Sequence, residues 1–290
     1  MKVLFDTDIG SDIDDAVCLA YLLANPECEL VGVTTVSGQP AERAKLASVL
    51  CKAANQPGVP VVPGAEAPFS GRQRQPLAKQ ASVLPRWPHE SRFPRLDAVD
   101  FMAETIHSHE RQVTLLAVGP MTNVAALFKK HPGVAGSLNG LMLMSGRFGP
   151  KPPSARADHE WNVYCDPVAA DIVYRTRVPV HRSVGLDVTL QVQMEEQAVR
   201  ARFSAHPGLL PVLDMATVWY QDAELMTFHD PLAAASLFDG RVCGFQRGRV
   251  EVDTGSGVTS WTRSEGGAHE VALTVDPKRF FESYFGVFER

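Results

Sequence analysis

The chain is predicted to form a single α/β domain over residues 1–290, with a mainly parallel, Rossmann-like central sheet flanked by helices. Short apolar or β-branched runs alternate with helical patterns along much of the chain, and this alternation is typical of a parallel sheet with helices on both faces. With 290 residues, 45% of them hydrophobic, the chain can build one large core. Internal repeats and low-complexity tracts are missing from the sequence, which favours one domain.

The expected elements follow in chain order. Strands are predicted at 3–5, 29–36, 59–64, 113–118, 141–145 and 178–184, with a later hairpin at 249–253 and 271–275. Helices are predicted at 16–24, 41–54, 96–107, 122–130, 195–203, 209–224, 232–237 and 277–285, with a further helix start at Asp166-Pro167. Residues 65–96 are rich in proline and arginine, and we expect a long loop that covers a functional site.

Composition excludes several classes of partner. The formal net charge is −5, which argues against binding to nucleic acid or to a membrane surface. No apolar run approaches the length of a membrane span, and the N-terminus lacks a signal-peptide pattern. The five cysteines are scattered without CxxC spacing, which favours reduced thiols over disulfides or a zinc site. We therefore expect a cytoplasmic protein.

An acidic turn between the first strand and the first helix dominates the sequence. Asp6, Asp8, Asp12, Asp14 and Asp15 fall within ten residues around a single glycine. Helix capping needs only one or two of these carboxylates, and the spacing does not fit an EF-hand. Because the carboxyl end of a strand is where α/β proteins place their sites, the turn predicts a site for a hard cation, calcium or magnesium.

Four segments together carry a family resemblance. The turn Asp6–Ala16, the block Gly119–Asn123, the segment Glu160–Asn162 and the pair His229-Asp230 resemble, in order and spacing, the motifs of the nucleoside hydrolases. These inosine-uridine preferring enzymes are calcium-dependent N-ribohydrolases. The resemblance implies a hydrolase that cleaves the N-glycosidic bond of ribonucleosides to ribose and free base. It also implies a nucleoside substrate, a place in nucleoside catabolism and salvage, and a homodimer or homotetramer.

Site roles follow from the same resemblance. It implies that Ca²⁺ is held by Asp8, Asp15, Asp230 and the carbonyl of Val118. Asp8 would take the proton of the attacking water, and His229 would face the leaving base. The implied substrate contacts are Asp12, Asp14, Gln39, Met144, Glu160, Asn162, Trp219 and Tyr220.

Several departures from the family pattern leave points open. The acidic turn is longer than its commonest form, which leaves open how the substrate contacts divide between Asp12 and Asp14. Gln39 and Ser154 stand where asparagine is common, and Ser145 stands where glycine is usual, which leaves the preferred base open.

Local readings compete with these functional roles. Thr122 and Asp166 fit helix caps, the latter with proline at the first helical position. Trp219 and Tyr220 also fit core packing. Glu160 and Asn162 would point the same way if the segment is extended.

Two other functions compete with hydrolysis. One is a catalytically altered relative that only binds nucleosides or ribosyl groups, since the departures permit it. The other is a haloacid-dehalogenase-like phosphatase, which also begins with a strand that ends in Asp-x-Asp and binds magnesium. That class expects Asp-Gly-Thr soon afterwards, so that a carboxylate can attack phosphorus, whereas Ile9-Gly10-Ser11 follows here.

Overall fold

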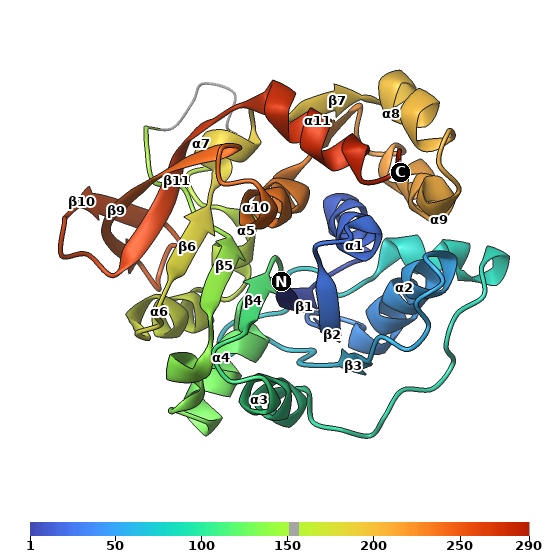
Figure 1. The fold of residues 1–290 in the computed structure, drawn as a ribbon. Helices are drawn as coiled ribbons and strands as arrows, with labels where there is room; N and C mark the ends of the chain where they lie inside the picture. The colour runs from blue at the N-terminus through green and yellow to red at the C-terminus, as the bar shows by residue number, and fades with distance from the viewer. Residues whose placement is uncertain (151–156, 290) are drawn as a thin grey trace.

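A computed structural model describes residues 1–150 and 157–289; the position of Ser154 lies outside them. In these residues nine strands form one sheet in the order β10-β9-β11-β6-β5-β4-β1-β2-β3 (Figure 1). Neighbours from β11 to β3 pair in parallel, and β9 pairs antiparallel with both β11 and β10. The strands are β1 Lys2–Thr7, β2 Glu29–Thr35, β3 Val61–Pro63, β4 Val113–Ala117, β5 Gly140–Met144, β6 His181–Val184, β9 Cys243–Val252, β10 Thr259–Arg263 and β11 His269–Val275. A separate antiparallel pair consists of β7 Gln193–Glu195 and β8 Leu225–Thr227.

Helices cover both faces of the large sheet (Figure 1). The helices are α1 Asp14–Ala24, α2 Pro40–Ala53, α3 Ala98–Ser108, α4 Thr122–Lys130, α5 Trp161–Cys165, α6 Pro167–Arg175, α7 Leu186–Thr189, α8 Glu196–Phe203, α9 Leu210–Trp219, α10 His229–Phe238 and α11 Pro277–Gly286. One buried core joins α1, α2, α9, α10 and α11, and the other joins α3, α4 and α6. Strand β1 serves both, since Val3 and Phe5 enter the first core and Leu4 the second. The predicted α/β architecture is confirmed.

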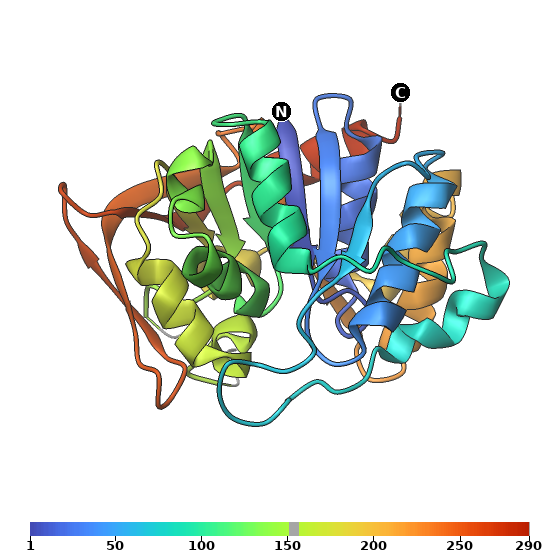
Figure 2. The same cartoon turned by 90° about the horizontal axis from the view of Figure 1, so that it is seen from below.

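Parallel register brings the carboxyl ends of the central strands to one edge. Thr7 of β1 pairs with Thr35 of β2, and Asp6 pairs with Ala117 of β4. The residues that follow these strands, including Asp8 and Val118, therefore meet at that edge. Figure 2 shows the segment between β3 and the next helical turn passing below these strand ends.

Three expectations about local structure need correction. The stretch 65–96 is not a continuous loop, because Lys79–Arg86 forms a 3₁₀ helix, η1. The C-terminal hairpin has longer strands than predicted and gains β10, which pairs with β9 across Thr259–Arg263. Thr122 does not cap α4: Met121 holds the N-cap position, and the Thr122 hydroxyl instead donates to Asp166 at 2.7 Å.

The predicted helix cap at Asp166 is confirmed. Asp166 caps α6 by accepting a hydrogen bond from the backbone N–H of Ala169 at 3.1 Å. All five cysteines are free thiols. None of the helices in the described part of the chain has the length and apolar character that a membrane crossing requires.

Candidate active site

The acidic turn is folded by its own backbone and by one threonine. Gly10 adopts φ +114°, a conformation that favours glycine. The Asp15 carboxylate accepts hydrogen bonds from the Thr7 hydroxyl and, at 3.1 Å, from the backbone N–H of Asp8. No side chain caps α1, whose N-cap position is Ile13. Capping therefore does not account for the aspartates of this turn.

Three buried carboxylates converge from two segments that are far apart in the chain. Oxygen atoms of Asp14, Asp15 and Asp230 all lie within 4.8 Å of one another. The backbone N–H of Asp230 donates to Asp14 at 3.2 Å, which ties the start of α10 to the start of α1. We call these three residues the acidic trio. An all-oxygen, buried, anionic set of this kind suits a hard divalent cation.

Burial and mutual repulsion disfavour the ionised form of the acidic trio. Burial raises the pKa of Asp14, Asp15 and Asp230 well above the usual value, and repulsion among the carboxylates raises it further. Burial also raises the pKa of Asp12 to about 6. Buried like charges must be protonated or neutralised by a positive charge. The cluster is thus unfavourable in its ionised form unless a cation is bound.

Asp8 lies beside the acidic trio. Its charge contributes to the raised pKa of Asp15, and its own pKa is raised by burial and lowered by the nearby Arg43 guanidinium. The Asp8 Oδ2 atom accepts a hydrogen bond from the side-chain amide of Gln75. The Asp8 Oδ1 atom faces Gly119, where an added Cβ would come within 2.7 Å. Glycine at position 119 therefore leaves room for this carboxylate.

Arg43 is a structural cation that sequence reasoning missed. Its side chain is fully buried in α2 and donates to the carbonyls of Asp8, Ile9 at 3.1 Å and Gly38 at 2.8 Å. It also donates to the carbonyl of Gln75 at 3.3 Å. Because the guanidinium binds backbone carbonyls from three segments, it fixes the acidic turn against the 65–96 stretch. Glu42 and Lys45 flank Arg43 in the sequence, so no local signal distinguishes this buried arginine from the other charged residues of α2.

Asn162 and Glu160 hold the strand ends together. The Asn162 side-chain amide donates to the carbonyls of Val118 at 2.6 Å and Met144 at 3.1 Å. Glu160 is the N-cap of α5 and accepts backbone hydrogen bonds from Asn162, Val163 and Gly146 at 2.6 to 3.1 Å. Burial nevertheless raises its pKa to about 7. The expectation of an extended segment is wrong here, because a helix begins at Trp161.

His229 opens α10 directly before Asp230. Its Nδ1 atom lies 2.7 Å from the hydroxyl of Thr189. Burial lowers the pKa of His229 to about 4, so the imidazole is neutral at pH 7 and can donate one hydrogen bond. Of the predicted His-Asp pair, Asp230 thus belongs to the acidic trio, and His229 directly precedes it at the start of α10.

Three predicted substrate contacts lie in other surroundings. Gln39 accepts a hydrogen bond from the backbone N–H of Ala78 at 2.9 Å and so supports η1. Trp219 donates to the carbonyl of Leu225 at 3.4 Å, and the Arg200 guanidinium lies 5.8 Å from the Tyr220 ring centroid. No hydrogen bond in the described residues links these three side chains to the acidic trio.

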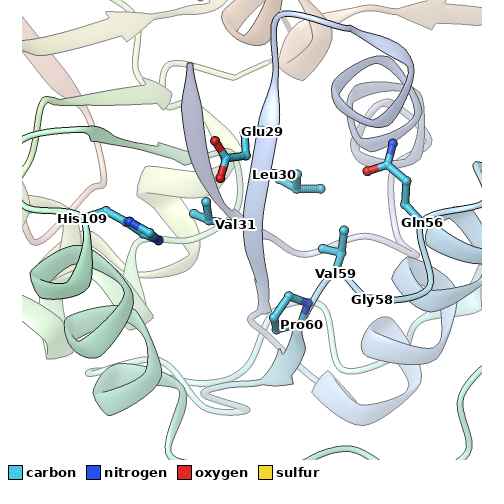
Figure 3. Close-up of a pocket in the computed structure, with 8 residues that line it drawn as sticks. All are labelled: Glu29, Leu30, Val31, Gln56, Gly58, Val59, Pro60 and His109. Atoms are coloured by element: carbon cyan, nitrogen blue, oxygen red, sulfur yellow. The ribbon is translucent and has the colours of Figure 1, made fainter.

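A shallow hollow at the opposite edge of the sheet differs from this site (Figure 3). It measures about 400 Å³ and lies at the amino end of β2, around Glu29 and Val31. His109 faces these two side chains in Figure 3, while Gln56 and Val59 lie on the other side of the strand. Its lining offers one carboxylate instead of a cluster. The candidate active site therefore lies at the carboxyl edge.

Comparisons with known proteins agree with this geometry. The family model of the inosine-uridine preferring nucleoside hydrolases matches residues 3–282. The chain is 31% identical over 268 residues to a pyrimidine-specific ribonucleoside hydrolase, RihA, of Shewanella sp. (strain ANA-3), covering 83% of this chain and 80% of that protein. It is 26% identical over 274 residues to uridine nucleosidase 1 of Arabidopsis thaliana, covering 87% and 78%.

Solved structures share the fold. A plant nucleoside hydrolase, PpNRh1, superposes with a TM-score of 0.84 at 23% identity, over 99% of this chain and 98% of that one. A purine-preferring ribonucleoside hydrolase from Gardnerella vaginalis gives 0.85 at 24% identity, with the same coverage. The family match overturns the phosphatase alternative. The chain belongs to the inosine-uridine preferring nucleoside hydrolase family.

Proposed function

We propose that this protein hydrolyses the N-glycosidic bond of ribonucleosides, releasing ribose and free base, with Ca²⁺ at the acidic trio. The observation that carries the proposal is the convergence of the buried Asp14, Asp15 and Asp230 within 4.8 Å, in a chain whose residues 3–282 match the family model. The proposed ligand set is Asp8, Asp15, Asp230 and the Val118 carbonyl; Asp14 lies beside these ligands, where it can hold a sugar hydroxyl. The activity, the metal and the residue roles are argued separately below.

The donor set fits calcium. Every ligand in the proposed set is an oxygen, and calcium accepts six to eight oxygens from carboxylates, carbonyls and water. The Val118 carbonyl receives the Asn162 amide at 2.6 Å and keeps a second lone pair for a cation. A Ca²⁺ ion held by these residues would supply binding of the sugar hydroxyls and a lowered pKa of a bound water.

The protein's own groups divide the remaining work. Asp8 accepts the proton of the attacking water as general base. Attack at the anomeric carbon passes through an oxocarbenium-like state, and the surrounding carboxylates stabilise its positive charge. Asp12, Asp14 and Asn162 hold the sugar hydroxyls.

The leaving base needs a hydrogen-bond donor. His229 fills this role as a neutral imidazole, since its Nδ1 can accept from the Thr189 hydroxyl at 2.7 Å and thereby leave the proton on Nε2. Glu160 and Met144 are proposed to line the sugar side. Gln39 is proposed to contact the substrate, and Trp219 and Tyr220 to approach the base.

Sugar release tests the activity directly. Reducing sugar is measured from a panel of purine and pyrimidine ribonucleosides, with added calcium and with a chelator. Uridine and cytidine come first, because sequence relatives are named for pyrimidine ribonucleosides and for uridine. Release that the chelator abolishes supports the proposal. Nucleoside binding without any release would support the binding-only alternative instead.

Asp8→Asn tests the proposed general base. We expect turnover to be abolished and the fold to be retained, because asparagine keeps the shape but cannot accept the water's proton. Steady-state rates and circular dichroism on the same sample measure both effects. Wild-type turnover in this variant would refute the mechanism. Sedimentation of the wild-type protein would test the expected homodimer or homotetramer.

A further inference from the structure

Gln75 reaches from the 65–96 stretch into the acidic turn. Its Nε2 atom donates to the Oδ2 of Asp8 and, at 3.1 Å, to the hydroxyl of Ser37. Its Oε1 atom accepts a hydrogen bond from the indole Nε1 of Trp161 at 2.8 Å. The Gln75 side chain is buried, so water competes little with these protein partners for hydrogen bonds to its amide.

The orientation of the Gln75 amide is determined by its two hydrogen-bond partners, Trp161 and Asp8. An indole N–H can only donate, and an ionised carboxylate can only accept. Trp161 on one side and Asp8 on the other therefore allow one orientation, with Oε1 toward the indole and Nε2 toward the carboxylate. A reversed amide would lose both hydrogen bonds at once.

Trp161 is not held in place by burial. Its side chain remains 46% exposed, at the first residue of α5 directly after the N-cap Glu160. An exposed indole that spends its N–H on Gln75 contributes orientation more than core packing. Arg43 anchors the other end, because it binds the carbonyls of both Gln75 and Asp8.

We propose that Gln75 is a positioning residue for Asp8, and that Trp161 acts on Asp8 through Gln75. With Oδ2 held by the amide and Oδ1 facing Gly119, the Asp8 carboxylate is limited to one orientation. This inference rests on the proposed function, in which Asp8 is both the general base and a calcium ligand. Loss of the amide leaves Asp8 in place but free to rotate.

We call the chain of hydrogen bonds from Trp161 through Gln75 to Asp8 the relay. A double-mutant cycle tests it. Gln75→Leu is expected to lower kcat about ten- to a hundredfold, as expected for losing a hydrogen bond to a charged group, with a small change in KM. Trp161→Phe should lower kcat less. The double variant should match Gln75→Leu alone, because Trp161 has nothing left to orient. A Gln75→Leu variant with wild-type kcat, or additive losses in the double variant, would overturn the proposal.

Matched controls separate positioning from general damage. Trp87→Phe removes a comparable indole hydrogen bond, to Asp214 at 2.9 Å. Gln56→Leu removes a comparable amide hydrogen bond, to the Leu23 carbonyl at 2.7 Å. Both should keep wild-type kcat. If either control lowers kcat as much as Gln75→Leu does, the positioning role is refuted.

Calcium titration gives a readout that does not depend on turnover. Isothermal titration of the same variants with CaCl₂ should show weaker binding in Gln75→Leu, no further weakening in the double variant, and unchanged binding in the controls. If wild-type protein binds calcium but releases no sugar, the proposed function fails. The calcium affinities of the single and double variants still test the relay in that case. Equal calcium affinity and equal kcat in Gln75→Leu and wild type would refute the relay.

Discussion

Two helices of the molecule begin around the same dipeptide, Asp-Pro, and use its carboxylate in opposite ways. Asp166 caps α6, and its carboxylate accepts hydrogen bonds from Ala169, Thr122 and Phe69 at 2.7 to 3.1 Å. Asp230 lies inside the first turn of α10, where its nearest charged partners are Asp14 and Asp15. The dipeptide indicates where a helix starts, and the surroundings of the carboxylate distinguish the helix cap at Asp166 from the proposed metal ligand at Asp230.

Asp230→Asn should break the comparison most strongly. We expect kcat/KM to fall more than about a hundredfold, because groups that merely support metal ligands already contribute ten- to a hundredfold. In chelator the variant should be more stable than wild type, since burial and neighbouring charges disfavour the ionised Asp230. Kinetics and thermal melts measure the two effects. A variant that is less stable in chelator would assign Asp230 a structural role like that of Asp166.

Calcium removal should also distinguish Asp230 from Asp166, through its effect on thermal stability. Ligand at about a hundred times its Kd stabilises a protein by about 2.7 kcal/mol, so wild-type protein should melt at a higher temperature with calcium than with chelator. Asp166→Ala should keep this increment, and Asp230→Asn should lose it. Differential scanning calorimetry provides the measurement. An unchanged increment in Asp230→Asn would remove this residue from the metal site.

Asp166→Ala should cost stability instead of activity. The variant loses a helix cap and leaves the buried Thr122 hydroxyl and Phe69 N–H without their acceptor, so the free energy of unfolding should fall by about 2 to 3 kcal/mol. Urea denaturation measures it. The kcat of the folded variant should stay close to that of wild type, and a loss comparable to that of Asp230→Asn would contradict the distinction.

A smaller effect is expected at His181, a buried histidine beside α6. Its burial disfavours a positive charge, as burial of Asp230 disfavours a negative one. His181 stacks on Tyr174 with ring centroids 5.2 Å apart, and both ring nitrogens lack a hydrogen-bond partner in the described residues. Burial lowers its pKa to about 3. As the pH falls below about 6.5, the unfolded chain binds a proton here that the folded protein does not, so stability falls.

His181→Phe should remove this acid sensitivity. Between pH 7.5 and 5, wild type should lose about 2 kcal/mol more than the variant. The free energy of unfolding at the two pH values, both in chelator, gives the answer. Equal losses in the two proteins would mean that His181 is protonated in the folded state.

The sequence predicts charge density and periodicity well, and side-chain contacts between distant segments poorly. Alternating strands and helices predicted the parallel sheet, and the five aspartates in one turn pointed to the carboxylate cluster that the structure shows. The hydrogen bonds of Arg43 and Gln75 to Asp8 span 35 and 67 residues, and no local pattern encodes such a contact. Helix α5 has only five residues, too few for a periodic signal, so Glu160 and Asn162 were expected in an extended segment.

The acidic trio also has a consequence for how the protein folds. Asp14 and Asp230 are 216 residues apart in the chain, and the backbone N–H of Asp230 donates a hydrogen bond to the Asp14 carboxylate. During synthesis the N-terminal turn emerges long before α10 exists, and closing so large a loop carries an entropic cost that only docking of α10 repays. The proposed cation site is therefore complete only after α10 has docked against the start of α1.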